Sequence, residues 1–248
     1  RRSRLPSLIM SALAYARVFI KDIEVVALSR NGGQSSKPFD SLNLAPYVGD
    51  DGVAVTANQA AVKTLVGADG ISVMNAEHGC VVKVVTKSGL APAGDGLVST
   101  TPNFALLALA ADCVPFAVAD PVNRVIAVGH AGWRGVLANV MQSVLDAFVA
   151  QGGNLQSAQA VIGPSICANC YEVPNERVAL FRGTSSSAIA DEFHLDLSTG
   201  VRSVLLQSIS KVHQIPGCTF EDTHLFSYRR ANGAPTGRGG LVIVMPSS

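Results

Sequence analysis

The chain has 248 residues, of which 48% are hydrophobic and 15% are charged, and its formal net charge at pH 7 is +1. This length and composition predict a globular protein with a large apolar core, and they exclude both a disordered chain and a protein that coats nucleic acid through a basic surface. No apolar run approaches the roughly 20 residues that a membrane-spanning helix requires, so we expect neither membrane nor nucleic-acid partners. The five cysteines, an odd number, favour a reducing, cytoplasmic compartment over a disulfide framework.

The first 17 residues differ in character from the rest of the chain. A basic segment over residues 1–4 precedes a short apolar run, an outline shared with signal peptides. That run is short for such a peptide and Arg17 follows it closely, so we predict an N-terminal extension over residues 1–17. No linker, repeat or shift in composition interrupts residues 18–248, and their mixed strand and helix patterns predict one α/β or α+β domain.

The first half of this domain alternates between apolar strands and polar loops. Residues 18–29 predict one or two strands, and a polar loop that begins at Arg30 follows. The loop is either a hairpin turn, which the spacing favours, or a ligand loop in which Arg30 contacts an anion. Asp50 and Asp51 predict the start of a helix that includes residues 57–66. Further strands are predicted over residues 71–74, 81–86, 104–110, 116–119 and 124–128.

The stretch from residue 111 to residue 135 is the most informative part of the sequence. Cys113 and His130 stand at the ends of two apolar runs, and a glycine-containing turn follows His130. A long helical pattern over residues 136–148 comes next. A strand, a glycine-rich turn and a helix start present side chains and free N–H groups to a ligand. Arg134, close to that helix start, can meet an anion through its charge and the nearby amides.

The last third of the chain contains one further pattern of interest. Residues 167–170 form Cys-Ala-Asn-Cys, a C-x-x-C pattern. A redox pair needs a helix N-terminus and a zinc finger needs a second pair, and since neither is evident we predict two ordinary loop cysteines. The other predicted elements are a strand over residues 160–162, helices over 175–182 and 201–213, and strands over 223–228 and 241–245.

Two of the five histidines have sequence neighbours that are typical of a functional site. His78 and His130 each stand beside a glycine at the end of an apolar run, as Cys113 ends another, whereas His194 and His213 have structural settings. Imidazole and thiolate together suit a borderline-soft cation such as zinc, and three ligands leave a position for water or substrate. The separations along the chain match no short zinc motif, so spacing alone favours a buried thiol with two satisfied histidines.

A set of short motifs, in order along the chain, carries information that the spacing of the candidate ligands does not. On these motifs the chain resembles the YfiH-like polyphenol-oxidase or laccase-domain family, whose members are regarded as zinc-dependent purine nucleoside phosphorylases. The motifs are RNGGQS (30–35), SLNL (41–44), VGDD (48–51), HG (78–79), DGLVST (95–100), ADCVP (111–115), GHAGWRG (129–135), IGPSI (162–166), CYEV (170–173), CT (218–219), FSYRR (226–230) and TGR (236–238).

The resemblance implies a zinc ion held by His78, Cys113 and His130, which would also form the catalytic centre. It implies phosphorolysis of adenosine, inosine, guanosine or methylthioadenosine to free base and sugar 1-phosphate, with adenosine deamination as a second activity. Purine nucleosides and phosphate are then the expected partners, and no nucleotide cofactor is needed. The implied fold is a single layered α-β-β-α domain with mixed sheets, related to cysteine-hydrolase-like proteins, as a monomer or small homo-oligomer.

Substrate contacts are expected at three further positions, and a residue that orients a ligand at a fourth. Arg30 is our first candidate for a phosphate contact, and Arg134 is the second. Asn43 is a candidate for binding substrate, and Asp112 for orienting a metal ligand from behind. The chain also departs from the family at residues 76–77, where Ala-Glu replaces the usual Gln-Val before the ligand histidine, and at residue 167, where a cysteine replaces a common glycine.

Four other functions fit parts of the pattern. A copper-binding, laccase-like polyphenol oxidase would place Cu²⁺ in the same site, but a four-copper oxidase needs many more histidines than five and the chain has no H-x-H pair. A metal-free cysteine hydrolase would use Cys113 activated by His130. An editing factor for peptidoglycan precursors, as reported for some bacterial relatives, would act on a nucleotide-linked peptide. A metal-binding module would hold zinc without turnover.

Overall fold

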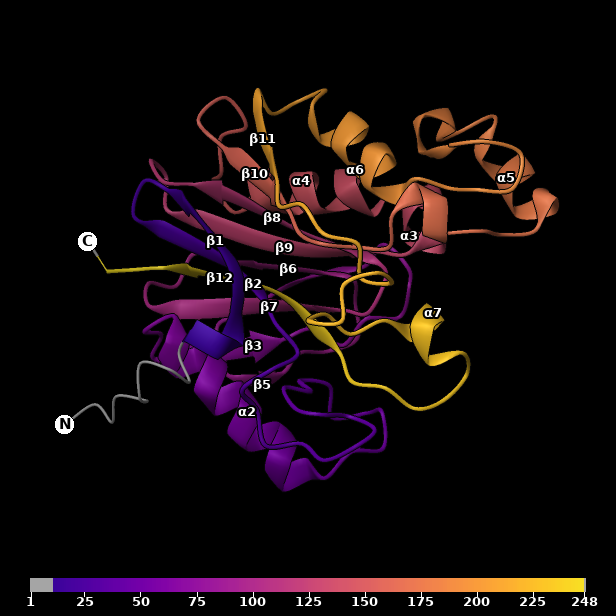
Figure 1. Cartoon of the computed structure of the whole chain (residues 1–248). Coiled ribbons are helices and arrows are strands. Elements are labelled where there is room, and N and C mark those ends of the chain that lie inside the picture. The colour runs from indigo at the N-terminus through magenta and orange to yellow at the C-terminus, as the bar shows by residue number, and fades with distance from the viewer. Residues whose placement is uncertain (1–10, 248) are drawn as a thin grey trace.

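The computed structural model describes residues 11–247, in which two six-stranded mixed sheets pack face to face (Figure 1). The first sheet has the strand order β1-β2-β12-β7-β3-β5 and the second has the order β11-β10-β8-β9-β6-β4. The strands of the first sheet are β1 (Ala14–Ile20), β2 (Ile23–Leu28), β12 (Gly239–Met245), β7 (Phe104–Ala110), β3 (Gly70–Val73) and β5 (Gly89–Leu90). Those of the second are β11 (Lys211–Gln214), β10 (Gln159–Ile162), β8 (Val114–Asp120), β9 (Val125–Ala131), β6 (Gly96–Ser99) and β4 (Val82–Val84).

Helices cover the outer face of each sheet, which gives α-β-β-α layers. α2 (Gly52–Leu65) packs Val62 and Leu65 against the first sheet, while α4 (Val140–Ala150) and α6 (Leu197–Leu205) cover the second (Figure 1). A separate set of buried apolar side chains from both sheets fills the space between them. The layered α/β fold with mixed sheets that the resemblance implies is therefore confirmed. No helix within residues 11–247 is long and apolar enough to cross a membrane.

The central strands explain the long apolar runs of the sequence. Every residue of β7, β8 and β9 is buried, because one face of each strand meets the other sheet and the opposite face meets helices. Such strands have near-continuous apolar sequences instead of alternating ones. The predicted helix start is also confirmed, since the Asp51 carboxylate accepts a hydrogen bond from the Val53 N–H and caps α2.

The first strand begins earlier than the sequence predicts. β1 starts at Ala14, so residues 14–17 of the predicted N-terminal extension belong to the first sheet, while residues 1–10 lie outside the described part of the chain. Arg17 pairs with Val26 in the ladder, and its guanidinium forms an ion pair with Glu24 on the neighbouring strand. This cross-strand partner allows a basic residue to sit inside a strand, which the search for apolar runs could not detect.

Two predicted helices are shorter than expected. The pattern over 136–148 is divided between α3 (Trp133–Leu137) and α4, because Asn139 adopts a left-handed conformation with φ of 55°. The helix predicted over 201–213 ends at Leu205, and residues 211–214 instead form β11, parallel to β10 at the edge of the second sheet. Pairing with β10 supplies hydrogen bonds that no local pattern reveals.

The predicted strand over residues 223–228 is absent from the structure. The chain there makes turns, and Ser227 caps the short helix α7 (Tyr228–Ala231) by accepting a hydrogen bond from the Arg230 N–H. The Arg230 guanidinium donates to the carbonyl groups of Thr219 and Leu225, among others. These bonds satisfy four backbone carbonyl groups between residues 219 and 225. The remaining helix, α5 (Asn175–Phe181), lies close to its predicted place.

Candidate metal centre

Three candidate ligands from separate segments meet at one point. His78 lies in the loop between β3 and β4, Cys113 in the connection from β7 to β8, and His130 in β9. β8 and β9 pair with Pro115 opposite His130, which brings Cys113 beside that histidine. One ligand atom from each residue lies within 4.8 Å of those of the other two. His130 is buried and His78 is exposed, so the group has one open side.

The carboxylate of Asp95 positions two of these three residues. It accepts hydrogen bonds from the backbone N–H groups of Glu77, His78 and Gly79, at 3.3, 2.8 and 2.7 Å, and so fixes the loop that carries His78. His130 Nδ1 donates to the same carboxylate at 2.9 Å, which leaves Nε2 for the centre. Burial alone would raise the pKa of Asp95, but these hydrogen bonds and the charge of His130 lower it overall.

Sequence reasoning missed Asp95 as a functional residue. It assigned the orienting role to Asp112, whose carboxylate instead accepts hydrogen bonds from the Thr219 hydroxyl at 2.6 Å and the Arg229 N–H at 2.7 Å. Asp112 therefore fastens the C-terminal loop beside Cys113, and Asp95 orients the histidines. The available signal was the DGLVST motif itself, in which Asp95 is the one ionisable residue.

Cys113 and His130 stabilise each other as a thiolate–imidazolium pair at neutral pH. Burial alone would raise the pKa of the Cys113 thiol, but the charge of His130 and hydrogen bonds from His130 and His78 lower it to about 6. Burial would likewise lower the pKa of His130, but the Cys113 thiolate and the Asp95 carboxylate raise it to about 9. The thiolate is the form of cysteine that binds metals, and a metal at this centre would displace the proton of His130.

The absence of a side chain at Gly132 leaves room for His78 and Cys113 to lie next to each other. A Cβ atom at this position would lie 2.8 Å from Cδ2 of His78 and 3.1 Å from Sγ of Cys113. Both distances are shorter than ordinary carbon and sulfur contacts, so any side chain here must displace a ligand. Position 132, in the turn after His130, therefore requires glycine because a larger residue would collide with His78 and Cys113.

Replacing Gly132 with alanine is expected to push His78 away and lower zinc affinity by about 10-fold, as changes that misplace a ligand do. Competition with a chromophoric chelator measures the affinity. Gly52→Ala is the matched control, because a Cβ at Gly52 meets nothing within 4 Å and its zinc affinity should stay unchanged. Equal affinities in the two variants would contradict the steric role of Gly132.

Aromatic and basic side chains surround the centre. The guanidinium carbons of Arg134 and Arg177 lie 4.4 and 4.8 Å from the centroid of the Trp133 ring. Arg229 lies over the Tyr171 ring at 5.3 Å. Burial raises the pKa of Tyr171, and the charge of nearby Cys113 adds to the increase. These groups offer both flat apolar faces and fixed positive charge next to Cys113.

The structure separates the residues that we expected to contact substrate. Arg134 is exposed and close to the start of α3, in a position open to an anion. The Arg30 guanidinium instead donates to the Asp40 carbonyl and lies over the Phe226 ring at 4.7 Å. Asn43 is fully buried.

The side-chain amide of Asn43 is fully used inside the protein. It donates to Asp50 and Ala45 and accepts from the Ala45 and Arg238 N–H groups. Asn43 therefore holds a loop together in this structure, and its assignment as a substrate contact stays a prediction.

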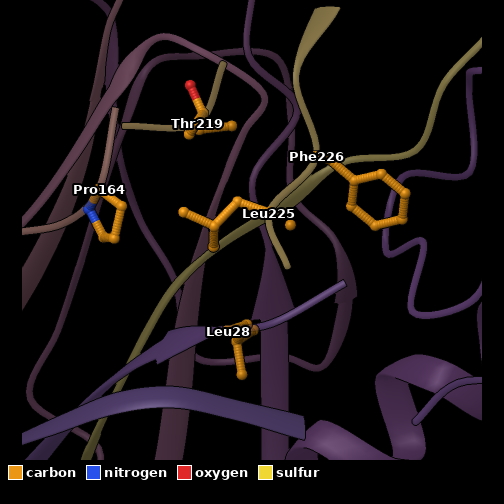
Figure 2. A pocket seen from close by; sticks show the side chains of 8 residues that line it. Leu28, Pro164, Thr219, Leu225 and Phe226 are labelled. Carbon is orange, nitrogen blue, oxygen red and sulfur yellow. The ribbon is translucent and has the colours of Figure 1, made fainter. Parts of the chain in front are cut away.

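A small pocket lies away from the ligands, under residues 219–226. Figure 2 shows Leu28, Pro164, Thr219, Leu225 and Phe226 among the residues that line it. None of the three candidate ligands lines this pocket. Its lining is largely apolar, so we assign no chemistry to it.

Most of the chain is similar to known proteins. The family model described as multi-copper polyphenol oxidoreductase laccase matches residues 24–246. The chain is 35% identical over 232 residues to a purine nucleoside phosphorylase of Mycobacterium tuberculosis, covering 90% of this chain and 92% of that protein. It is 29% identical over 247 residues to adenosine deaminase RL5 from an unknown prokaryotic organism, with 89% and 94% covered. The crystal structure of Bacillus licheniformis hypothetical protein YfiH matches with a TM-score of 0.83 at 27% identity, covering 94% of this chain and 97% of that one.

Proposed function

Because the chain belongs to the multi-copper polyphenol oxidoreductase laccase family, we propose that its His78, Cys113 and His130 centre binds zinc and serves the phosphorolysis of purine nucleosides. The observation that carries the proposal is this three-ligand centre, with a thiolate and an Asp95-oriented imidazole, in a chain that is 35% identical to a purine nucleoside phosphorylase over 90% of its length. Adenosine, inosine, guanosine and methylthioadenosine are the proposed substrates.

The donor set supports zinc binding more than it supports multi-copper oxidation. Two imidazoles and one thiolate suit zinc and leave a fourth position open, although a single Cu²⁺ could use the same ligands. A four-copper oxidase would need the other three histidines nearby. Each of these bonds to a partner elsewhere: His194 to Asp191, His213 to Gln159, and His224 to Asn31.

The residues around the centre support the proposed reaction. In phosphorolysis a phosphate oxygen bonds to the anomeric carbon, the bond from that carbon to the purine nitrogen breaks, and the base leaves with a proton. When bound, the metal supplies a Lewis acid to the centre. Trp133 and Tyr171 offer faces for the purine ring, and Arg134 offers a planar guanidinium that binds phosphate through two parallel hydrogen bonds. Arg30 is a second phosphate contact only if it leaves Asp40.

A phosphate-dependent assay tests this function. Adenosine, inosine and methylthioadenosine are each incubated with zinc-loaded protein, with and without inorganic phosphate, and free base and sugar 1-phosphate are quantified. Base release that requires phosphate is expected for at least one of the three. Zinc-loaded protein that releases no base with phosphate would overturn the proposal.

Adenosine deamination is a second candidate, favoured by the similarity to adenosine deaminase RL5. Its product, inosine, forms without phosphate, so the phosphate-free arm of the same assay measures it separately. Inosine formation that depends on zinc supports this second activity, and adenosine that remains unchanged in that arm contradicts it.

Replacing Arg134 with alanine is expected to raise the KM for phosphate about 10-fold, the size of one charge-assisted hydrogen bond, and to leave the zinc content unchanged. Steady-state kinetics with varied phosphate measure the change. Arg182→Ala, which removes an exposed arginine at the end of α5, is the control and should keep the normal KM. A normal KM in both variants would assign phosphate binding to other residues.

A further inference from the structure

A second group of metal-binding side chains lies outside the centre described above. Cys167, Cys170, Cys218 and Glu221 each offer a ligand atom, and these atoms all lie within 4.8 Å of one another. The pair at 167 and 170 follows β10, and the pair at 218 and 221 follows β11. Two residue pairs 51 positions apart therefore face each other.

The fold itself brings the two loops together. β10 and β11 are parallel neighbours, so the segments that follow them leave the sheet at the same edge. Beyond the sheet the pairing continues at an isolated parallel bridge between Ser165 and Cys218, and the Thr219 N–H donates to the Ser165 carbonyl at 3.1 Å. The cluster is therefore held by backbone bonds and does not depend on mobile side chains alone.

The two loops share the same spacing of donors. Cys167 and Cys170 form a C-x-x-C, and Cys218 and Glu221 form a C-x-x-E. A turn that presents two donors two residues apart is the usual half of a structural zinc site, and two such turns complete a tetrahedron. Sequence analysis treated the first pair as ordinary loop cysteines because the matching half is so distant and ends in a carboxylate.

One sulfur of the cluster already accepts a hydrogen bond from the opposite loop. The Cys167 N–H donates to Sγ of Cys218 at 3.3 Å. The two loops are therefore bonded to each other at the position of the candidate ligands.

Neighbouring arginines offset the negative charge of such a site. The Arg229 guanidinium donates to the carbonyl groups of Cys170 and Glu172, at 3.4 and 2.9 Å. Arg230 donates to the Phe220 carbonyl at 3.0 Å, between Cys218 and Glu221. A site of three thiolates and one carboxylate around a divalent ion is anionic, so two fixed cations at its edge stabilise it.

We propose that Cys167, Cys170, Cys218 and Glu221 bind a second zinc ion, separate from the His78 centre and structural in role. Zinc–sulfur bonds of about 2.3 Å in a tetrahedron place the donors roughly 3.8 Å apart, so donors within 4.8 Å need to contract by only about 1 Å. Four protein ligands leave no open position, which is typical of structural sites. This proposal does not depend on the reaction at the first centre.

The second ion would also support the first centre from a distance. Cys218 is followed by Thr219, whose hydroxyl donates to Asp112, and Arg229 beside the cluster donates its N–H to the same carboxylate. Asp112 directly precedes Cys113 and has a left-handed backbone with φ of 101°. Zinc in the cluster would hold the two loops that keep Asp112 in this unusual conformation.

Zinc stoichiometry on purified, reduced protein tests the proposal. Mass spectrometry of the metal content is expected to give two zinc ions per chain in the unchanged protein, one in Cys170→Ser, and one in His78→Ala. Cys80→Ser is the matched control, because Cys80 is the fifth cysteine and belongs to neither ligand group, so it should keep two. Cobalt substitution adds a spectroscopic check: the thiolate-to-metal band should fall far more in Cys170→Ser than in His78→Ala.

Glu221→Gln guards against a cysteine variant that fails to fold, because Glu221 is exposed and its change leaves the thiols intact. In competition with a chelator, this variant is expected to have an affinity for the second zinc ion that is about 10-fold lower, and an unchanged affinity for the first. A single zinc per chain that is lost in His78→Ala and kept in Cys170→Ser would overturn the proposal. A disulfide among the three cysteines, in place of a bound ion, would overturn it too. Unchanged zinc binding at the second site in both Cys170→Ser and Glu221→Gln would also overturn it.

Discussion

Asp95→Asn is expected to reduce zinc affinity at the His78 centre by about 10–100-fold, and nucleoside phosphorolysis with it. The Asp95 carboxylate accepts hydrogen bonds from three backbone N–H groups and from His130. An asparagine amide has the same shape but only one acceptor oxygen, so its NH₂ group would face N–H donors that then lack partners. We expect the free energy of unfolding to fall by about 3 kcal/mol as well, since the residue is 1% exposed. Zinc competition and thermal unfolding measure the two effects.

Asp120→Asn separates the two effects. Asp120 is also buried and accepts hydrogen bonds from the Val122, Asn123 and Asn154 N–H groups, but it ends β8 at the end of the strand opposite to Cys113. This variant should lose stability in the same way and keep its zinc affinity. If Asp95→Asn were destabilised but bound zinc normally, the orienting role of Asp95 would be wrong.

Removing the metal is expected to abolish phosphorolysis, with a decrease of at least about 100-fold, beyond the 10–100-fold typical of residues that only orient ligands. The reason is that the metal is the Lewis acid of the proposed reaction, and its three ligand side chains cannot supply one themselves. Dialysis against a chelator, followed by a zinc titration, should restore activity as the centre fills. Metal content and rate are measured on the same samples.

This experiment also distinguishes the zinc enzyme from a cysteine hydrolase. Cys113→Ser should inactivate both, because Cys113 is a ligand in one mechanism and the nucleophile in the other. Chelation separates them, since a thiolate activated by His130 needs no metal. Phosphorolysis that survives complete metal removal would refute the zinc function, and activity restored by copper but not by zinc would change the assigned metal.

The fold was largely predictable from the sequence because its central strands are buried on both faces. The continuous apolar runs behind β7, β8 and β9 could only be strands of a covered sheet, and the capping Asp51 marked the start of α2. Elements at the edges were not predictable. β11 looked like the end of a helix because its pairing partner, β10, is distant in sequence. Residues 223–228 looked like a strand because the bonds that the Arg230 guanidinium makes to backbone carbonyls leave no apolar pattern in the sequence.

What the sequence alone determined about the site was a set of residue types: one cysteine and two histidines at the ends of apolar runs, which the family resemblance joined into one ligand set. Spacing could not join them, because the contact between Cys113 and His130 depends on the pairing of β8 and β9, and that of His78 depends on Asp95. Only the tertiary structure showed that the Asp95 carboxylate bonds to His130 and to the loop of His78, and that Asp112 bonds to the C-terminal loop instead. It alone also placed Cys218 and Glu221 against Cys167 and Cys170, because parallel strands bring together loops that the chain separates by 51 positions.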